Sequence, residues 1–170
     1  MSREIVEYED RWVIKPLRGR TAERFVWHED TVEIYFDRDF RLVIGRGAEL
    51  SLRNISPSAP QRHSIEHWPS SDVERYLSSE VLSPVFFKSG GMRIAFRTGW
   101  LLLVADDLSD VVASLYSSRG LLWTRTGLVE QPEYPVVMID PWTGDRIPGP
   151  HWPPRPKDLD IDYDSDDIND

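Results

Sequence analysis

A chain of 170 residues without cysteine cannot form disulfide bonds or use thiolate chemistry, and its length fits one domain with an appendage. The net charge of −9 is unevenly distributed, because residues 1–127 carry 18 acidic and 17 basic side chains whereas residues 128–170 carry 11 and 3. In the first part the basic residues are interspersed with acidic ones, which argues against direct binding of a nucleic-acid backbone.

No stretch of the sequence approaches the roughly 18 consecutive apolar residues that cross a bilayer. The first residues, MSREIVEYEDRW, are charged and lack the apolar centre of a signal peptide. We therefore expect a cytoplasmic protein with no membrane partner.

One pattern occurs twice, sixty positions apart, and the rest of the chain is arranged around it. Residues 32–44 read VEIYFDRDFRLVI, and residues 92–104 read MRIAFRTGWLLLV. In each copy, apolar side chains at every second position lead to a short polar turn, and the alternation resumes at an aromatic residue. This period of two is typical of a β-hairpin with one buried face. We predict that the two hairpins superpose and form the core, with Phe36 and Phe96 in equivalent positions.

Further strands are predicted where short apolar alternations are bounded by turn residues, at 11–14, 23–28, 49–54, 85–87, 111–116 and 121–124. Gly45 and Gly47 are expected to close a hairpin turn between two strands, in preference to binding phosphate. Residues 108–116 also have a helical interpretation, because Asp107 or Ser109 is able to cap a helix there.

One amphipathic helix is predicted after a proline-containing loop at residues 56–70. Ser71 is a suitable N-cap with Glu74 as its capping-box partner, and the apolar stripe comprises Val73, Tyr76, Leu77 and Val81. The predicted fold class is therefore α+β and mostly β. Two pseudo-repeated antiparallel meanders, about 60 residues apart, are expected to form a sheet or half-barrel with this one helix.

Composition divides the chain into three parts, of which residues 1–127 are the β-rich globular domain. Residues 128–156 hold eight of the 13 prolines and are expected to dock partly on that domain, with the apolar run 135–139 along a sheet edge or groove. Residues 157–170 alternate aspartate with apolar or small side chains and are expected to form a disordered acidic tail.

The paired hairpin pattern, the short helix before its second copy and a closing strand pair at residues 115–127 resemble a small β-rich domain of unknown function found in high-GC bacteria. The resemblance covers residues 12–127, and the residues similar to its opening element are Trp12, Pro16, Leu17 and Gly19. It implies a fold, with no catalytic residues or cofactor to carry over.

The sharpest chemical motif is His63-Ser-Ile-Glu66-His67, which has the H-x-x-E-H spacing of inverted zinc peptidases. That chemistry needs both imidazoles on one helix face and a third, distant ligand. Because Pro60 and Pro69 confine any helix here to about eight residues, we expect no metal site. A zinc-dependent hydrolase that uses His63, Glu66 and His67 is the alternative.

No other set of side chains forms a convincing catalytic constellation, so we expect a non-enzymatic protein–protein interaction domain without a cofactor. The acidic end favours an immunity or antidote-type inhibitor of a basic partner, such as a toxin or nuclease, because carboxylates complement a cleft built for phosphates. A small-ligand carrier, with a half-barrel lined by tryptophans, is a further alternative. The expected partner-binding residues are Trp142, Trp152, Asp158, Asp160, Asp162, Asp164 and Asp166.

Overall fold

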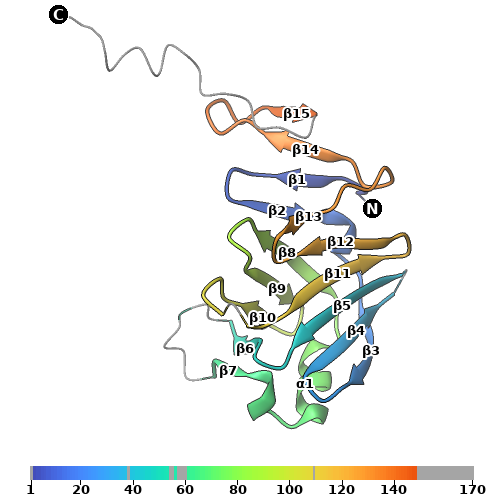
Figure 1. Ribbon diagram of the computed structural model, residues 1–170, viewed down its shortest axis with the longest axis vertical. Coiled ribbons are helices and arrows are strands. Elements are labelled where there is room, and N and C mark those ends of the chain that lie inside the picture. Colours follow the sequence, from blue (N-terminus) through green and yellow to red (C-terminus); the bar gives the residue numbers. More distant parts are fainter. Residues whose placement is uncertain (1, 38, 54–55, 57–60, 109, 149–170) are drawn as a thin grey trace, which may run out of the picture.

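The computed structural model describes residues 2–37, 39–53, 56, 61–108 and 110–148. In this part of the chain two β-sheets pack against each other, and one α-helix lies near one end of them (Figure 1). The expected mostly-β fold with one helix is confirmed, and the described strands form no closed barrel. No helix among the described residues is long and apolar enough to cross a membrane.

The larger sheet has nine strands in the order β15-β14-β1-β2-β8-β9-β10-β6-β7, and every pairing in it is antiparallel except that of β14 with β1. The smaller sheet has six strands in the order β13-β12-β11-β5-β4-β3. The larger sheet consists of β1 (Ile5–Glu7), β2 (Arg11–Ile14), β6 (Glu49–Leu52), β7 (His63–Ser64), β8 (Val81–Phe87), β9 (Met92–Phe96), β10 (Trp100–Val104), β14 (Val136–Ile139) and β15 (Arg146–Pro148). The smaller sheet consists of β3 (Ala22–Trp27), β4 (Thr31–Phe36), β5 (Phe40–Gly45), β11 (Ala113–Ser117), β12 (Gly120–Thr124) and β13 (Gly127–Leu128).

Both copies of the repeated pattern form antiparallel hairpins, as predicted, and each belongs to a three-stranded meander. The meander β3-β4-β5 lies in the smaller sheet and β8-β9-β10 in the larger one. Phe36 and Phe96 meet between the two sheets, with ring centroids 6.5 Å apart. The predicted core residues of the hairpins are all at most 4% exposed: Ile34, Phe36, Leu42, Ile94, Phe96 and Leu102.

The prediction that Gly45 and Gly47 close a hairpin is wrong. The strands that this segment joins, β5 and β6, belong to different sheets, so the turn carries the chain from one sheet to the other. Ala48 N–H donates to the Gly45 carbonyl at 3.0 Å, and the turn lies against Val111. A Cβ on Gly47 would lie 2.8 Å from Cγ2 of Val111, so the crossing leaves no room for a side chain.

The helix α1 (Ser70–Leu77) starts earlier than predicted, with Pro69 at the N-cap and no side-chain cap hydrogen bond. Ser71 is therefore inside the helix. The Glu74 carboxylate instead accepts a 2.7 Å hydrogen bond from Trp27 Nε1 on β3, and this tertiary contact replaces the expected capping box. The helix buries Val73 and Leu77 in the core, as expected, whereas Val81 begins β8.

Strands β11 and β12 form the expected last hairpin, and the helical alternative at residues 108–116 is wrong. Two short 3-10 helices, η1 (Lys15–Leu17) and η2 (Ile65–His67), complete the described elements. The strands that follow β12 in the chain are divided between the two sheets. Strand β13 pairs with β12 in the smaller sheet, and β14 pairs with β1 in the larger one. The apolar run at 135–139 thus lies along the sheet edge at β1, where Met138 is fully buried.

Candidate functional site

Six neighbouring strands of the larger sheet place one residue each in a single row on its outer face, directed away from the core. We call this set the outer row, and its Cα register runs Val137–Val6–Val13–Val85–Arg93–Leu103. Val6, Val85 and Leu103 are at most 6% exposed, although they do not belong to the central core cluster. These three side chains are therefore already shielded from solvent. The accessible members of the row are the partly exposed Val137, Val13 and Arg93, and binding at this face would centre on them.

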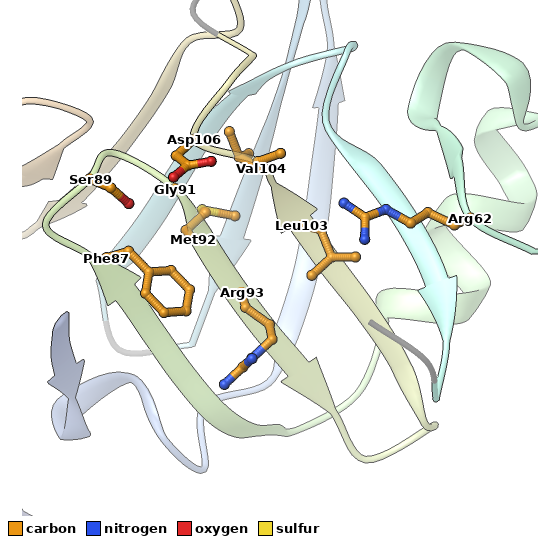
Figure 2. Close-up of a pocket in the computed structure, with 10 residues that line it drawn as sticks. Arg62, Phe87, Ser89, Gly91, Met92, Arg93, Leu103, Val104 and Asp106 are labelled. Atoms are coloured by element: carbon orange, nitrogen blue, oxygen red, sulfur yellow. The ribbon is translucent and has the colours of Figure 1, made fainter. Parts of the chain in front are cut away.

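Arg93 interrupts the outer row at a surface pocket of about 270 Å³. Phe87 from β8 and Leu103 from β10 flank it, and Figure 2 shows the three side chains side by side. The guanidinium carbon of Arg93 lies 5.6 Å from the centroid of the Phe87 ring, and among the described residues this guanidinium has no hydrogen bond or ion pair. A half-buried guanidinium on an aromatic face, without a carboxylate of its own, is suited to receive one.

Arg62 lines the same pocket beyond Leu103, but its charge is already paired. Its guanidinium lies 2.9 Å from the Glu49 carboxylate on β6, and its side chain is only 11% exposed. A second hollow of about 360 Å³ adjoins the pocket, because Arg62, Ala105 and Asp106 line both. Asp106 adds negative charge to that end of the groove, so an acidic ligand is favoured at Arg93 and disfavoured beyond Leu103.

Arg125, which follows β12 in the smaller sheet, holds the loops that form the end of the pocket. Its side chain donates to five backbone carbonyls, those of Gly90, Ala105, Asp106, Leu108 and Val111. Arg125 also lies close to the β8–β9 turn. Gly90 in this turn has a φ of +106°, and a Cβ added to Gly90 would lie 3.0 Å from the backbone carbonyl oxygen of Arg125. The guanidinium fork thus ties the larger sheet's loops to the smaller sheet and fixes one wall of the site.

The outer face of the smaller sheet carries a different arrangement, in which arginines and tyrosines alternate across four strands. Arg24, Tyr35, Arg41 and Tyr116 are cross-strand neighbours on β3, β4, β5 and β11. The guanidinium carbon of Arg24 lies 3.8 Å from the Tyr35 ring centroid, and that of Arg41 lies 4.3 Å from the Tyr116 centroid. Such cation–π pairs stabilise neighbouring strands, so we interpret this face as structural.

Glu33 on β4 is the acidic centre of that face. Its carboxylate accepts hydrogen bonds from Arg41, His28 and the Tyr35 hydroxyl. The bond from Arg41 contributes most, followed by those from His28 and Tyr35, and together they lower the pKa of Glu33 from 4.5 to about 2. Because the folded-state pKa is lowered, the carboxylate stabilises the fold above the unfolded pKa, and this stabilisation is lost as the pH falls from about 4.5 to about 2.

We expect Glu33→Gln to lower the free energy of unfolding at pH 7 by ~1–2 kcal/mol, because a neutral amide cannot replace the charged acceptor and partial exposure screens the loss. The difference from the unsubstituted chain should shrink as the pH falls toward 2, because Glu33 begins to be protonated near its pKa. Urea unfolding across this pH range measures both effects. Glu29→Gln, at an exposed position in the β3–β4 turn, is the matched control. A stability difference that stays constant with pH would contradict the assignment.

The residues of the zinc-peptidase alternative do not share a helix. His63 lies in the short strand β7, whereas Glu66 and His67 lie in the 3-10 helix η2. The His63 ring contacts Trp68 at a centroid distance of 6.2 Å, and Nδ1 of His67 lies 3.0 Å from the Ser64 hydroxyl. In the described part of the chain, no three histidine, aspartate or glutamate side chains gather into a metal-binding group. The segment therefore lacks the single helix face that the H-x-x-E-H motif requires.

Trp142 is the one expected partner-binding residue that the structure describes. It lies in the turn between β14 and β15 with 41% of its surface exposed, and Oδ1 of Asp140 accepts a 2.8 Å hydrogen bond from its backbone N–H. This turn follows the strand that holds Val137, the first member of the outer row. The other expected residues lie outside the described residues: Trp152, Asp158, Asp160, Asp162, Asp164 and Asp166.

Two of the tryptophans invoked for a ligand-lined half-barrel fill the interior instead. Trp123 is fully buried, and its ring lies 4.7 Å from that of Phe86. Trp100 stacks on Tyr76 of α1 at 4.1 Å and contacts Trp68 edge-on at 5.3 Å. Trp123 thus packs on a strand residue and Trp100 packs at the helix, so neither ring supports a small-ligand carrier.

Sequence reasoning missed Arg93 and Phe87 as site residues, because it followed the core-facing positions of each strand. The available signal was on the alternate positions, where Val13, Val85 and Leu103 are apolar although their neighbours along the strand already face the core. Comparisons of the chain with protein-family models, curated proteins and solved structures find no match. The resemblance of residues 12–127 to a small β-rich bacterial domain therefore stays a prediction.

Proposed function

We propose that this chain is a non-enzymatic protein-interaction domain that binds an extended segment of a partner protein across the outer row. The observation that supports this most is Arg93, which has no hydrogen bond or ion pair among the described residues and stands within an apolar row. Six strands spaced about 4.8 Å apart make a surface about 24 Å long, which suits several consecutive residues of an extended chain. Apolar contacts along the row supply affinity, and the guanidinium selects a segment that carries a carboxylate.

The shape of the site favours a protein segment over a small molecule. Small-molecule sites usually enclose most of the ligand surface in a cleft of about 300–1,000 Å³. The pocket at Arg93 holds about 270 Å³ and adjoins a row of side chains on a sheet face, of which Val13 and Val137 are partly exposed. A flat, elongated surface with one deeper pocket matches the recognition of an extended chain with one anchoring side chain.

A more specific form of the proposal is an immunity or antidote-type inhibitor of a basic partner, such as a toxin or nuclease. Its support is the charge distribution, since residues 128–170 carry 11 acidic and 3 basic side chains while the preceding part is nearly neutral. Carboxylates at that end would steer a basic partner toward the domain and occupy a cleft that accepts phosphates. The outer row would then hold an adjoining segment of the same partner.

Purified basic proteins encoded next to this chain's gene are the candidates for a direct test by titration calorimetry. We expect Arg93→Glu to weaken the affinity for the true partner about tenfold or more, because it reverses the charge at the anchoring pocket. Arg24→Glu is the matched control, since Arg24 also lies on an aromatic ring but belongs to the other sheet. Equal affinities for the Arg93→Glu variant and the unsubstituted chain would disprove the outer row as the binding surface.

Removal of residues 157–170 should slow capture of a basic partner and leave the free energy of unfolding within ~0.5 kcal/mol, because these residues lie beyond the described strands. Raising the salt concentration from 50 to 500 mM, roughly a threefold shorter Debye length, should weaken capture by the full chain more than capture by the truncated chain. Stopped-flow association rates at several salt concentrations measure the effect. An identical salt dependence for both chains would show that residues 157–170 take no part in capture of the partner.

A further inference from the structure

We propose that the pocket beside Arg93 recognises two charges of the partner segment: an acidic side chain that binds Arg93, and a basic side chain two positions along the segment that binds Asp106. This inference rests on the proposed function, because it specifies the partner segment for the same site. It makes Asp106 the residue that selects the second charge.

Arg93 and Asp106 line the same pocket without pairing with each other. Figure 2 places Asp106 on one side of Met92 and Arg93 on the other. Asp106 is exposed, and among the described residues its carboxylate has no hydrogen bond or ion pair, which is also true of the Arg93 guanidinium. The pocket therefore offers one positive and one negative charge to a ligand that carries the opposite pair.

The strand register sets the spacing of the two residues. Arg93 on β9 is opposite Leu103 on β10, and Asp106 follows Leu103 by three residues, which span at most about 10 Å. A glutamate and a lysine two positions apart in an extended segment lie on the same side of it, with Cα atoms about 7 Å apart. Their long side chains cover the remaining distance. A segment with the pattern acid-x-base is therefore able to contact both charges at once.

The backbone that carries Asp106 is held in place before any ligand binds. The carbonyl oxygens of Ala105 and Asp106 accept hydrogen bonds from Nη2 of Arg125 at 3.0 and 3.2 Å. Gly91 packs against the same segment, since a Cβ on Gly91 would lie 2.8 Å from the Val104 carbonyl oxygen and 3.3 Å from the Asp106 nitrogen. Because the backbone is already ordered, binding at Asp106 loses little conformational entropy of the domain.

The surroundings of Asp106 favour a basic side chain over a second acidic one. The adjoining hollow is lined by one basic residue, Arg62, and three acidic ones, Glu49, Asp106 and Asp107, which sum to −2. Arg62 is already paired with Glu49 at 2.9 Å. A basic partner of the class proposed above offers lysines and arginines for this end of the groove. The same partner segment still needs one acidic residue for Arg93.

Synthetic peptides with acetyl and amide ends test the pattern on the full chain, because blocked ends leave only side-chain charges. The probe is Val-Thr-Val-Thr-Glu-Ala-Lys, and three matched peptides end instead in Glu-Ala-Glu, Lys-Ala-Lys or Glu-Lys-Ala. Titrations at low salt are followed by the ¹⁵N chemical shifts of the Arg93 and Asp106 amides. The probe should bind about threefold tighter than each matched peptide, the effect expected for one partly exposed ion pair.

Asp106→Arg should reverse the preference, so that the peptide ending in Glu-Ala-Glu binds more tightly than the probe. Arg93→Glu should make the peptide ending in Lys-Ala-Lys the tightest of the four. Asp107→Arg is the matched control, because it makes the same change of charge at an exposed neighbour that lines the adjoining hollow and not the pocket. It should leave the order of affinities unchanged. A merely structural role of Asp106 would not produce a gain of binding.

Three results would overturn the inference: no shift with any peptide at millimolar concentration, equal affinity of the unsubstituted chain for the probe and its matched peptides, or an unchanged preference in Asp106→Arg. Calorimetry with the true partner tests the proposed function separately. Loss of partner affinity in Arg93→Glu, together with equal affinities for all four peptides, would leave the proposed function intact and remove only the acid-x-base pattern.

Discussion

Replacing Phe96 or Phe36 with alanine should lower the free energy of unfolding by about 3–5 kcal/mol each, the largest effect we expect from any single substitution. Both rings are at most 4% exposed, and they contact each other between the two sheets. Truncation of either therefore removes buried apolar surface and leaves a cavity where the two hairpins meet. Urea unfolding followed by tryptophan fluorescence measures the change.

Leu82→Ala is the control for this prediction, because Leu82 lies in the same meander with 42% of its surface exposed. Leu82→Ala should lower the free energy of unfolding by no more than ~0.5 kcal/mol. Alanine variants of Phe36 and Phe96 that are as stable as the unsubstituted chain would show that the two hairpins do not share a core.

Replacing Arg125 with methionine should lower the free energy of unfolding by about 2–3 kcal/mol, since the long side chain is kept but every donor is lost. Five backbone carbonyls accept hydrogen bonds from Arg125, and methionine leaves them without this partner. Arg125→Lys should recover little, because one ammonium group cannot reach carbonyls on two separate loops.

The loop between β10 and β11 should open locally in the same variant. Leu108 N–H donates to the Ala105 carbonyl and Val111 N–H to the Leu108 carbonyl, so hydrogen exchange at these two amides should become faster. Arg119→Met is the control, because the Arg119 side chain is 74% exposed and lies at the β11–β12 turn. Unchanged exchange at Leu108 and Val111 would mean that Arg125 does not hold the loop.

Local pattern determined the strands, because side chains that alternate between apolar and polar every second residue bury one face as a β-strand and as no other element. Both repeated hairpins follow from that alternation alone, whereas the contact between Phe36 and Phe96 comes from the packing of the two sheets. The helix was visible for the same kind of reason, since Val73 and Leu77 are spaced to bury one side of it. The first residue of the helix was not predicted correctly. The Glu74 carboxylate, which was expected to form the capping box, accepts a hydrogen bond from Trp27 instead.

The local sequence pattern does not predict which of the two sheets each strand joins. Gly45 and Gly47 have the composition of a hairpin turn, yet β5 and β6 lie in different sheets. What decides the outcome is the packing of this turn on Val111, which is far away in the sequence. Alternation states that one face of a strand is buried, but it does not state which other strand lies beside it.

The alternation of each strand, and hence the mostly-β fold with its paired hairpins, was determined by the sequence by itself. The tertiary structure alone decided the candidate site, because Val137, Val13 and Arg93 come from distant parts of the chain and share a row only through strand register. The same holds for charge: a sequence shows that an arginine is present, whereas only the fold shows that the Arg93 guanidinium lies on Phe87 with no carboxylate of the described residues beside it. Register and pairing arise from contacts between remote segments, which no local window of residues contains.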